Sequence, residues 1–245
     1  MPGGWELVAT SGIVLAAGVI VGLAGFGFAL FAVPPLLFIH EPAEVVALVN
    51  LLGFGSGVSV LLGEWREIRR PALLALLPWA LPGLAAGNLL LRSADGRSIK
   101  LMAGIVVSAF ALYATAGFRI PGIDRPAATA VAGLSSGVLG ASVGLGGPPI
   151  ALLFTGRSLP PGVFRVTIAA YFMVINMVAV ALLAATGVLE RRSVALALAL
   201  APASLVGRWC GRRLADRVSP AAFRRIVLAL LLLTGATGAI GALLA

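Results

Sequence analysis

Eight uncharged apolar runs divide this chain of 245 residues, and two of them have a length that suits no single membrane helix. A spanning helix needs about 20 residues, with a usual range of about 17–25. The two exceptions, Leu7–Ile39 and Ala127–Thr155, hold 33 and 29 residues, too few for two full spans and a loop. Both contain glycines and prolines, and irregular backbone persists in a bilayer only where it is buried in protein or lines a wet cavity. Each is therefore predicted to be two helical pieces that meet at a break.

The other six runs each approach the length of one span. They are Val45–Gly63, Ala72–Leu91, Leu101–Phe118, Val166–Leu189, Ser193–Gly207 and Ile226–Ala245. The chain is 60% hydrophobic and 11% charged, against about 25% charged residues in a soluble domain. Strands of about ten alternating residues, the mark of a membrane β-barrel, are absent. The sequence predicts an all-α integral membrane protein with about eight membrane elements, the first and fifth of them broken or re-entrant.

Glycines and prolines recur at constant spacing in the two halves. Gly18, Gly25, Gly27 and Pro42 correspond to Gly137, Gly144, Gly146 and Pro161 at an offset of 119 residues, and Pro78, Gly83 and Gly87 correspond to Pro202, Gly207 and Gly211 at an offset of 124. This pattern predicts a duplicated four-element unit, residues 1–120 and 121–245, that together form one transport domain. The polar Pro/Gly segment 119–126 is the predicted connector.

Two topologies remain open. If each broken element crosses the bilayer, the repeats are parallel and the loops place 11 basic residues on one side and 7 on the other. If each is a re-entrant hairpin, the repeats are inverted and the split is 13 to 5. Cytoplasmic loops are enriched in Lys and Arg, so the sharper asymmetry favours the re-entrant alternative. Both alternatives place the basic segment 208–225 in the cytoplasm and both termini outside.

Charge and rare residues exclude several functions. The net charge of +9 comes from basic residues in short loops, as in cytoplasmic loops of membrane proteins, so no nucleic-acid partner is expected. Cys210 and His40 are the only residues of their kinds, which argues against a disulfide, a metal cluster, a cofactor site or a His-dependent catalytic triad. We expect no enzyme. Glu6 is the only charge before the first run, so no cleavable signal peptide is predicted.

The glycines at the two breaks are the first candidate binding groups. A helix that restarts after a break exposes backbone N–H groups and a partial positive charge, which suits an anion. The predicted contacts are Gly25, Phe26 and Gly27 at the first break, and Gly144, Gly146, Gly147 and Pro148 at the second. Pro148 and Pro149 suit a first helical turn, where no N–H is needed, whereas Pro34 and Pro35 come later in their run. The alternative is that the glycines only let helices approach closely, which is the interpretation preferred for Gly18/Gly22, Gly83/Gly87 and Gly207/Gly211.

Polar side chains within the runs supply the remaining candidates. Arg165 opens the sixth run, where a cation opposes the helix dipole; it either binds a sulfonate, sulfite or carboxylate through two parallel hydrogen bonds or snorkels to the interface. Arg208 is expected to snorkel. Asn50 and Asn176 either join helices or contact a substrate, and Asn88 has a weaker claim. The runs contain no paired Asp or Glu for a proton relay or a cation site, so the substrate is predicted to be an anion.

Two glycine motifs resemble signatures of a known family. Gly22-Leu-Ala-Gly25-Phe-Gly27 and Gly140-x-x-x-Gly144-Leu-Gly146-Gly147-Pro148-Pro149 resemble the two motifs of the sulfite exporter TauE/SafE family, and the length, eight elements and duplication are similar over the whole chain. The resemblance implies a multi-pass secondary transporter for sulfur-containing anions, in the bacterial inner membrane. The first break reads Gly-Phe-Gly-Phe, without the consecutive glycines of some members, which leaves the specific anion open.

Three functions are therefore weighed. The first is an exporter of sulfite or an organosulfonate that works by alternating access around helix breaks at 25–35 and 144–149. The second is a transporter or channel for another small solute, such as a carboxylate. The third, a membrane enzyme or scaffold, finds little support because the chain has one histidine and symmetric helix breaks. The expected partners are a small anion and the lipid bilayer, and exposed glycine faces permit a homodimer.

Overall fold

The computed structural model describes residues 4–116 and 120–215, and within these ranges the chain is helical without strands. The helices are α1 (Gly4–Ala24), α2 (Phe28–Leu36), α3 (Pro42–Glu64), the 3-10 turn η1 (Trp65–Glu67), α4 (Arg70–Ser93), α5 (Gly96–Ala116), α6 (Pro126–Val143), α7 (Gly147–Gly156), α8 (Pro161–Ala185) and α9 (Arg191–Ala215). The eighth apolar run, Ile226–Ala245, lies outside the described residues. The predicted all-helical fold is confirmed.

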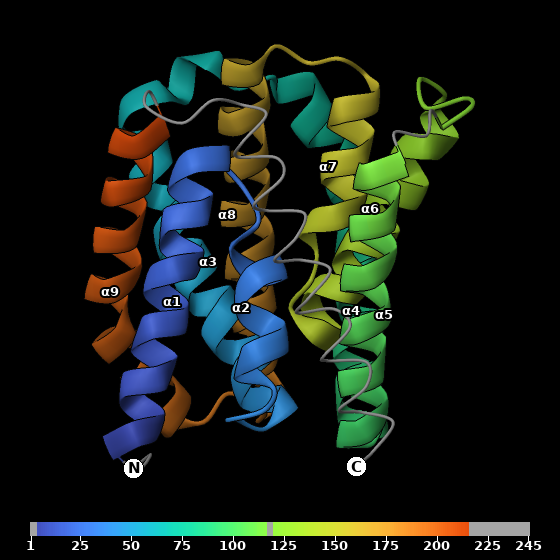
Figure 1. Cartoon of the computed structure of the whole chain (residues 1–245). Helices are drawn as coiled ribbons and strands as arrows, with labels where there is room; N and C mark the ends of the chain where they lie inside the picture. Colours follow the sequence, from blue (N-terminus) through green and yellow to red (C-terminus); the bar gives the residue numbers. More distant parts are fainter. Residues whose placement is uncertain (1–3, 117–119, 216–245) are drawn as a thin grey trace.

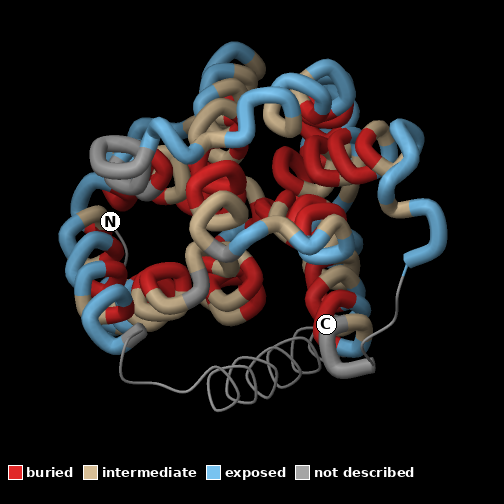
Figure 2. The backbone as a smooth tube through the Cα atoms, turned by 90° about the horizontal axis from the view of Figure 1, so that it is seen from above, coloured by how far each residue is buried: buried red, intermediate tan, exposed pale blue. Residues whose placement is uncertain are grey.

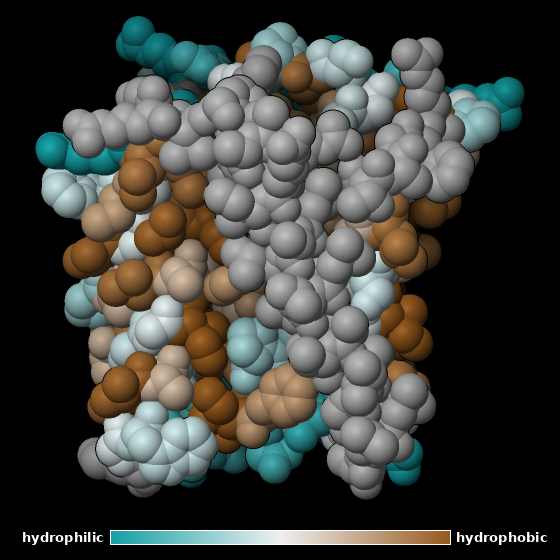
Figure 3. All heavy atoms as spheres, in the orientation of Figure 1, coloured by the Kyte–Doolittle hydropathy of each residue, from teal (hydrophilic) through white to brown (hydrophobic). Residues whose placement is uncertain are grey.

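The outer surface is that of a multi-pass membrane protein. Six helices in the described ranges, α1, α4, α5, α6, α8 and α9, are long and apolar enough to cross a membrane. Large apolar side chains face outward, including Trp5, Leu74 and Leu198, which are 68%, 64% and 70% exposed. In Figure 3 apolar atoms gather between two ends where hydrophilic atoms are concentrated. Lipid, rather than water, is the natural solvent of such a surface.

Both over-long runs divide into a long and a short helix, as predicted. Gly25 (φ 79°) and Gly27 (φ 99°) separate α1 from α2, and Gly144 (φ 75°) ends α6 before α7. These left-handed values suit glycine because a Cβ would strain the backbone there. The breaks differ in detail: Gly146, the counterpart of Gly27, is right-handed, and α7 has prolines in its first turn whereas α2 has them in its interior.

Each short helix turns back along the long helix before it (Figure 1). In the first pair, Thr10 Oγ1 on α1 lies 2.8 Å from Nε2 of His40, which follows α2. In the second pair, Arg157 Nη2 after α7 donates to Thr129 Oγ1 on α6 at 2.8 Å. The contacts join the start of a long helix to the end of the short one, so both pairs are helical hairpins with the glycine break at the bend.

Glycine also brings the long helix of each hairpin close to a further helix, α1 to α9 and α6 to α4. Gly18 and Gly22 of α1 pack on Gly207 and Gly211 of α9, and a Cβ added at any of the four would overlap a backbone carbonyl oxygen of the other helix. Gly83 and Gly87 of α4 pack in the same way on α6 around Gly137 and Val138. The predicted packing role of these glycines is confirmed. Seen from above (Figure 2), buried residues occupy the facing sides of the helices and exposed residues most of the rim.

The α1–α9 contact gives a direct stability test. A Cβ at Gly211 would overlap the Val19 carbonyl oxygen, which is backbone and cannot rotate away. We expect Gly211→Ala to lower the free energy of unfolding by about 1–3 kcal/mol through over-packing, seen as a lower unfolding temperature in detergent. Gly55→Ala is the matched control, because nothing lies within 4 Å of a Cβ there. Equal unfolding temperatures for the two variants would contradict the packing role.

Candidate functional site

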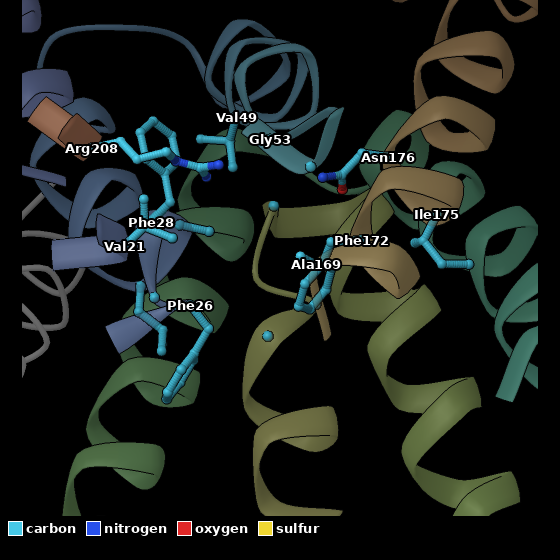
Figure 4. Close-up of a pocket in the computed structure, with 18 of the residues that line it drawn as sticks. Val21, Phe26, Phe28, Val49, Gly53, Ala169, Phe172, Ile175, Asn176 and Arg208 are labelled. Atoms are coloured by element: carbon cyan, nitrogen blue, oxygen red, sulfur yellow. The ribbon is translucent and has the colours of Figure 1, made fainter. Parts of the chain in front are cut away.

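Both helix breaks open onto one cavity inside the described part of the chain (Figure 4). The cavity has a volume of about 90 Å³, whereas a cavity that holds one ordered water needs about 10–15 Å³. It therefore has room for several waters or one small oxyanion. Its lining comes from seven helices and both breaks: Val21, Gly22, Gly25–Leu30, Val49, Gly53, Gly57, Gly140, Gly144, Gly146, Gly147, Arg165, Ala169, Phe172, Ile175, Asn176, Arg208 and Arg212.

The first break brings backbone donors and Arg165 to the cavity. The first intrahelical bond that closes on Gly27 comes from Phe31 N at 3.2 Å, so the N–H groups of Phe28–Leu30 have no acceptor within α2. Those residues line the cavity. A Cβ at Gly25 would overlap Cγ of Arg165, so the arginine stem lies directly on this glycine. The missing side chain at Gly25 thus makes room for the Arg165 side chain of α8.

A serine side chain of α6 stabilises the backbone of the second break. Ser136 Oγ on α6 donates to the Gly146 carbonyl at 2.7 Å, and both groups are buried. Gly144 faces Val33 of α2 and Val49 of α3, at 3.4 and 3.6 Å from a Cβ position. The second break therefore also packs on the first hairpin. Gly147 opens α7 at the cavity, but the following Pro148 and Pro149 carry no N–H, so this helix start offers fewer donors than α2.

The contact between α3 and α8 closes another side of the cavity. A Cβ at Gly53 would overlap Asn176 Nδ2, and one at Gly57 would lie 2.8 Å from Met173 Cβ. In Figure 4 the Asn176 amide points at Gly53. These two glycines are one helical turn apart, so they form a small-residue face on α3 that lets α8 and its amide approach closely.

The side-chain charge of the cavity is positive. Arg165, Arg208 and Arg212 line it, and its described lining contains no Asp or Glu. Arg208 is only 7% exposed and reaches from α9 toward Val49 (Figure 4), so it lies in the protein interior rather than at the interface where it was expected to snorkel. The helix continues seven residues beyond it, to Ala215, which carries position 208 below the end of α9.

Eight of the ten sequence-predicted site residues line the cavity: Gly25, Phe26, Gly27, Gly144, Gly146, Gly147, Arg165 and Asn176. Asn50 and Pro148 do not. Asn50 is 2% exposed and donates through Nδ2 to the Val46 and Gly140 carbonyls, at 2.8 and 3.3 Å. It ties α3 to α6 next to the second break, the helix-joining alternative. Asn88 likewise joins α4 to Thr186 after α8, with Nδ2 to Oγ1 at 3.3 Å.

Loss of the Asn50 amide tests this structural role. In Asn50→Leu the Gly140 carbonyl loses a buried donor, which we expect to lower stability by about 1 kcal/mol, the scale of hydrogen bonds between membrane helices. Thermal unfolding in detergent measures it, with Asn176→Leu as the matched amide in the cavity wall. An Asn50→Leu variant that loses anion affinity while keeping its stability would return Asn50 to the binding site.

Some of the lining residues that the sequence analysis missed do have a recognisable sequence signal. Gly53 and Gly57 have the small-x-x-x-small spacing that marks a helix contact. Arg208 directly follows Gly207, a glycine of the α9 face that packs on α1. Its position next to a helix-contact glycine is a signal that it can be buried. Phe172 and Arg212 carried no such signal. In residues 4–116 and 120–215 no cluster of His, Cys, Asp or Glu is arranged to hold a metal ion.

Comparison with known proteins assigns the chain to a family. The family model "Sulfite exporter TauE/SafE" matches residues 11–237. The chain belongs to this family. A TauE/SafE relative from Cupriavidus necator, described as a probable sulfite/organosulfonate exporter TauE, is 25% identical over 222 residues, which cover 87% of this chain and 85% of that protein. No solved structure matches the chain. The resemblance inferred from the two glycine motifs is confirmed, and the TauE/SafE family is one of membrane exporters.

Proposed function

We propose that this protein is a secondary transporter that exports sulfur-containing anions, such as sulfite or an organosulfonate. The observation that carries the proposal is the cavity where the start of α2 and three arginines meet without a carboxylate in the described lining. Backbone N–H groups and the positive end of a helix favour an anion. A guanidinium such as that of Arg165 can hold two oxygens of a sulfonate or sulfite at once. Membership of the TauE/SafE family supports the same substrate class.

Transport would occur by alternating access around the helix breaks at 25–35 and 144–149. We interpret the halves 1–120 and 121–245 as inverted repeats whose first two helices form re-entrant hairpins. Two kinds of matched contact support this. The α1–α2 hairpin of the first half has a counterpart in the α6–α7 hairpin of the second, and the α1–α9 contact between the halves has a counterpart in the α4–α6 contact. In Figure 1 the α3–α4, α5–α6 and α7–α8 connections lie at one end of the molecule, which agrees with the 13-to-5 distribution of basic residues. Discontinuous helices at a repeat interface are typical of secondary transporters.

The basic end would face the cytoplasm of a bacterium, in its inner membrane. A transporter of another small anion, such as a carboxylate, is the second candidate, because carboxylates also bind backbone donors and arginine.

Ligand-dependent stabilisation tests the proposal and separates the candidates. Purified protein in detergent is heated with sulfite, with an alkyl sulfonate, with the carboxylate of the same chain length, and with chloride at equal ionic strength. A ligand raises the unfolding temperature according to its occupancy. We expect sulfite or the sulfonate to stabilise more than the carboxylate, and chloride to have no effect.

Uptake into proteoliposomes of the stabilising anion then tests movement rather than binding alone. Stabilisation by the carboxylate alone would favour the second candidate. If sulfite, the sulfonate and the carboxylate all fail to stabilise the protein, an anion site in this cavity is overturned.

A further inference from the structure

The two hairpins are fastened at their open ends by different chemistry. Thr10 and Thr129 are separated by 119 residues, the offset that relates the glycines of the two breaks. Each threonine hydroxyl holds a basic side chain that follows the short helix, His40 after α2 and Arg157 after α7. We call these contacts the first clasp (Thr10, His40, Glu44) and the second clasp (Thr129, Arg157).

The second clasp carries a fixed charge. Besides Thr129, the Arg157 guanidinium donates from Nε to the Ile123 carbonyl at 3.0 Å and from Nη2 to the Arg125 carbonyl at 3.4 Å. Arginine stays protonated throughout the physiological range. The second clasp therefore has the same hydrogen bonds at every pH at which the protein functions.

The first clasp centres on the only histidine of the chain. The His40 side chain is 2% exposed, with Nε2 2.8 Å from Thr10 Oγ1 and Nδ1 3.1 Å from Glu44 Oε2. Arg192 of α9 lies with Nε 3.5 Å from the other Glu44 oxygen. The Glu44 side chain is only 14% exposed. The network joins α1, the α2–α3 turn, α3 and α9.

We propose that the first clasp is a proton-binding site that tightens the α1–α2 hairpin, while the second clasp is insensitive to pH. Histidine is the side chain that changes charge between about pH 5 and 8. The protonated ring donates from both nitrogens, to Thr10 and to Glu44, and its bond to the carboxylate gains charge. On deprotonation the proton leaves to water past Glu44. The neutral ring keeps one N–H, so one of the two bonds depends on the threonine hydroxyl as donor.

The two clasps lie at opposite ends of the molecule, so a proton bound at the first clasp would affect only one end. In Figure 1 the end of α2 lies at the end of the molecule that carries the N-terminus, and the end of α7 lies at the opposite end. A proton would thus act on one hairpin and from one side of the membrane. Resting on the proposed function, this gives the transporter a proton site outside the anion cavity.

The other charged side chains at this end must be counted in any pH response. A Cβ at Gly96 would lie 3.7 Å from Pro42 Cγ, which places the start of α5 beside the α2–α3 turn. The other charged residues of the elements meeting here are Glu6 on α1, Glu41 next to His40, Asp95, Arg97 and Lys100 at the start of α5, and Glu190 and Arg191 at the start of α9. None of them is a second histidine.

Hydrogen exchange of the full chain in nanodiscs, without added anion, tests the proposal independently of transport. After correction for intrinsic rates, we expect amides of the segment 28–41 to exchange about fivefold faster at pH 8 than at pH 6, because a charge-assisted bond is about twice as strong as a neutral one. His40→Gln should remove this pH response. Segment 147–160 should exchange equally at both values, and Arg157→Gln should speed its exchange at both.

Thr10→Val is a second variant, needed in case His40→Gln does not fold, and it leaves His40 and Glu44 in place. It removes the hydrogen bond to His40 Nε2, so exchange of segment 28–41 should be faster at both pH values. Isotope-labelled histidine adds a direct readout, since tag-free protein gives one imidazole signal, which is recorded at pH 6 and pH 8 beside the exchange of segment 28–41. A pH response of 28–41 that survives in His40→Gln, or none in the wild type, would overturn the proton site. Neither result would bear on the anion-binding test.

Discussion

Arg165→Ala is expected to lower the affinity for the proposed substrate anion by about 10–100-fold while the protein stays folded. A hydrogen bond to a charged group contributes about 1.5–3 kcal/mol, and about 1.4 kcal/mol corresponds to a tenfold change in affinity. Arg165 lines the cavity and lies on Gly25, so its loss removes charge from the wall at the first break. Arg165→Lys should recover part of the affinity, because an ammonium keeps the charge without the planar pair of donors.

The measurement is a titration of the stabilising anion by calorimetry, with the unfolding temperature of the anion-free protein beside it. Arg70→Ala is the matched control: Arg70 also stands in the first turn of a helix, but it is exposed and outside the cavity lining. Unchanged transport by Arg165→Ala in proteoliposomes would remove Arg165 from the site.

Gly25→Ala is expected to reduce transport at least tenfold, since it disturbs two features at one position. Its φ of 79° disfavours a side chain, which costs about 1–2 kcal/mol in the left-handed region. Its Cβ would also overlap the Arg165 stem, so either the arginine or the break must move. Anion affinity should fall with transport, and the unfolding temperature should fall as well.

Gly12→Ala separates these effects from a general response to a larger residue in α1. Position 12 is an exposed helical glycine with nothing within 4 Å of a Cβ, where alanine favours the helix by about 0.5–1 kcal/mol. A Gly25→Ala protein with wild-type affinity and transport would show that the conformation of the first break is not needed for binding.

The parts of the fold that could be predicted from the sequence are those governed by length and by backbone chemistry. Hydrocarbon thickness limits helix length, so the over-long runs had to break, and glycine with proline marked where. The position of Pro148 and Pro149 at the start of α7 follows from the missing N–H. The glycine spacing also indicated that Gly18/Gly22 and Gly207/Gly211 let helices approach closely, and the structure shows that they pack on each other.

The contacts of individual side chains could not be predicted as well, because they depend on which helices pack together. Asn50 and Asn176 looked alike in sequence, but α6 stands opposite Asn50 and accepts its hydrogen bond, whereas Asn176 faces a glycine beside the cavity. His40 and Glu44 lie at the edges of two apolar runs, and the α1–α2 hairpin covers them because Thr10 of α1 reaches the His40 ring. Arg208 is buried because α9 continues past it to Ala215. The uncharged run ends at Gly207, so the end of a run does not mark the end of a helix.

The unequal prolines of the two breaks have a consequence for how a substrate lies in the cavity. Three consecutive N–H groups start α2, while two prolines at positions 148 and 149 leave α7 with little to donate. Donor strength is therefore concentrated beside Gly27 and Arg165. An organosulfonate has one charged head and one apolar tail, so we expect it to bind with its head toward α2 and its tail toward Phe172 and Ile175 of α8, in one polarity rather than two. Two hairpins of similar fold can in this way bind an asymmetric molecule in one preferred orientation.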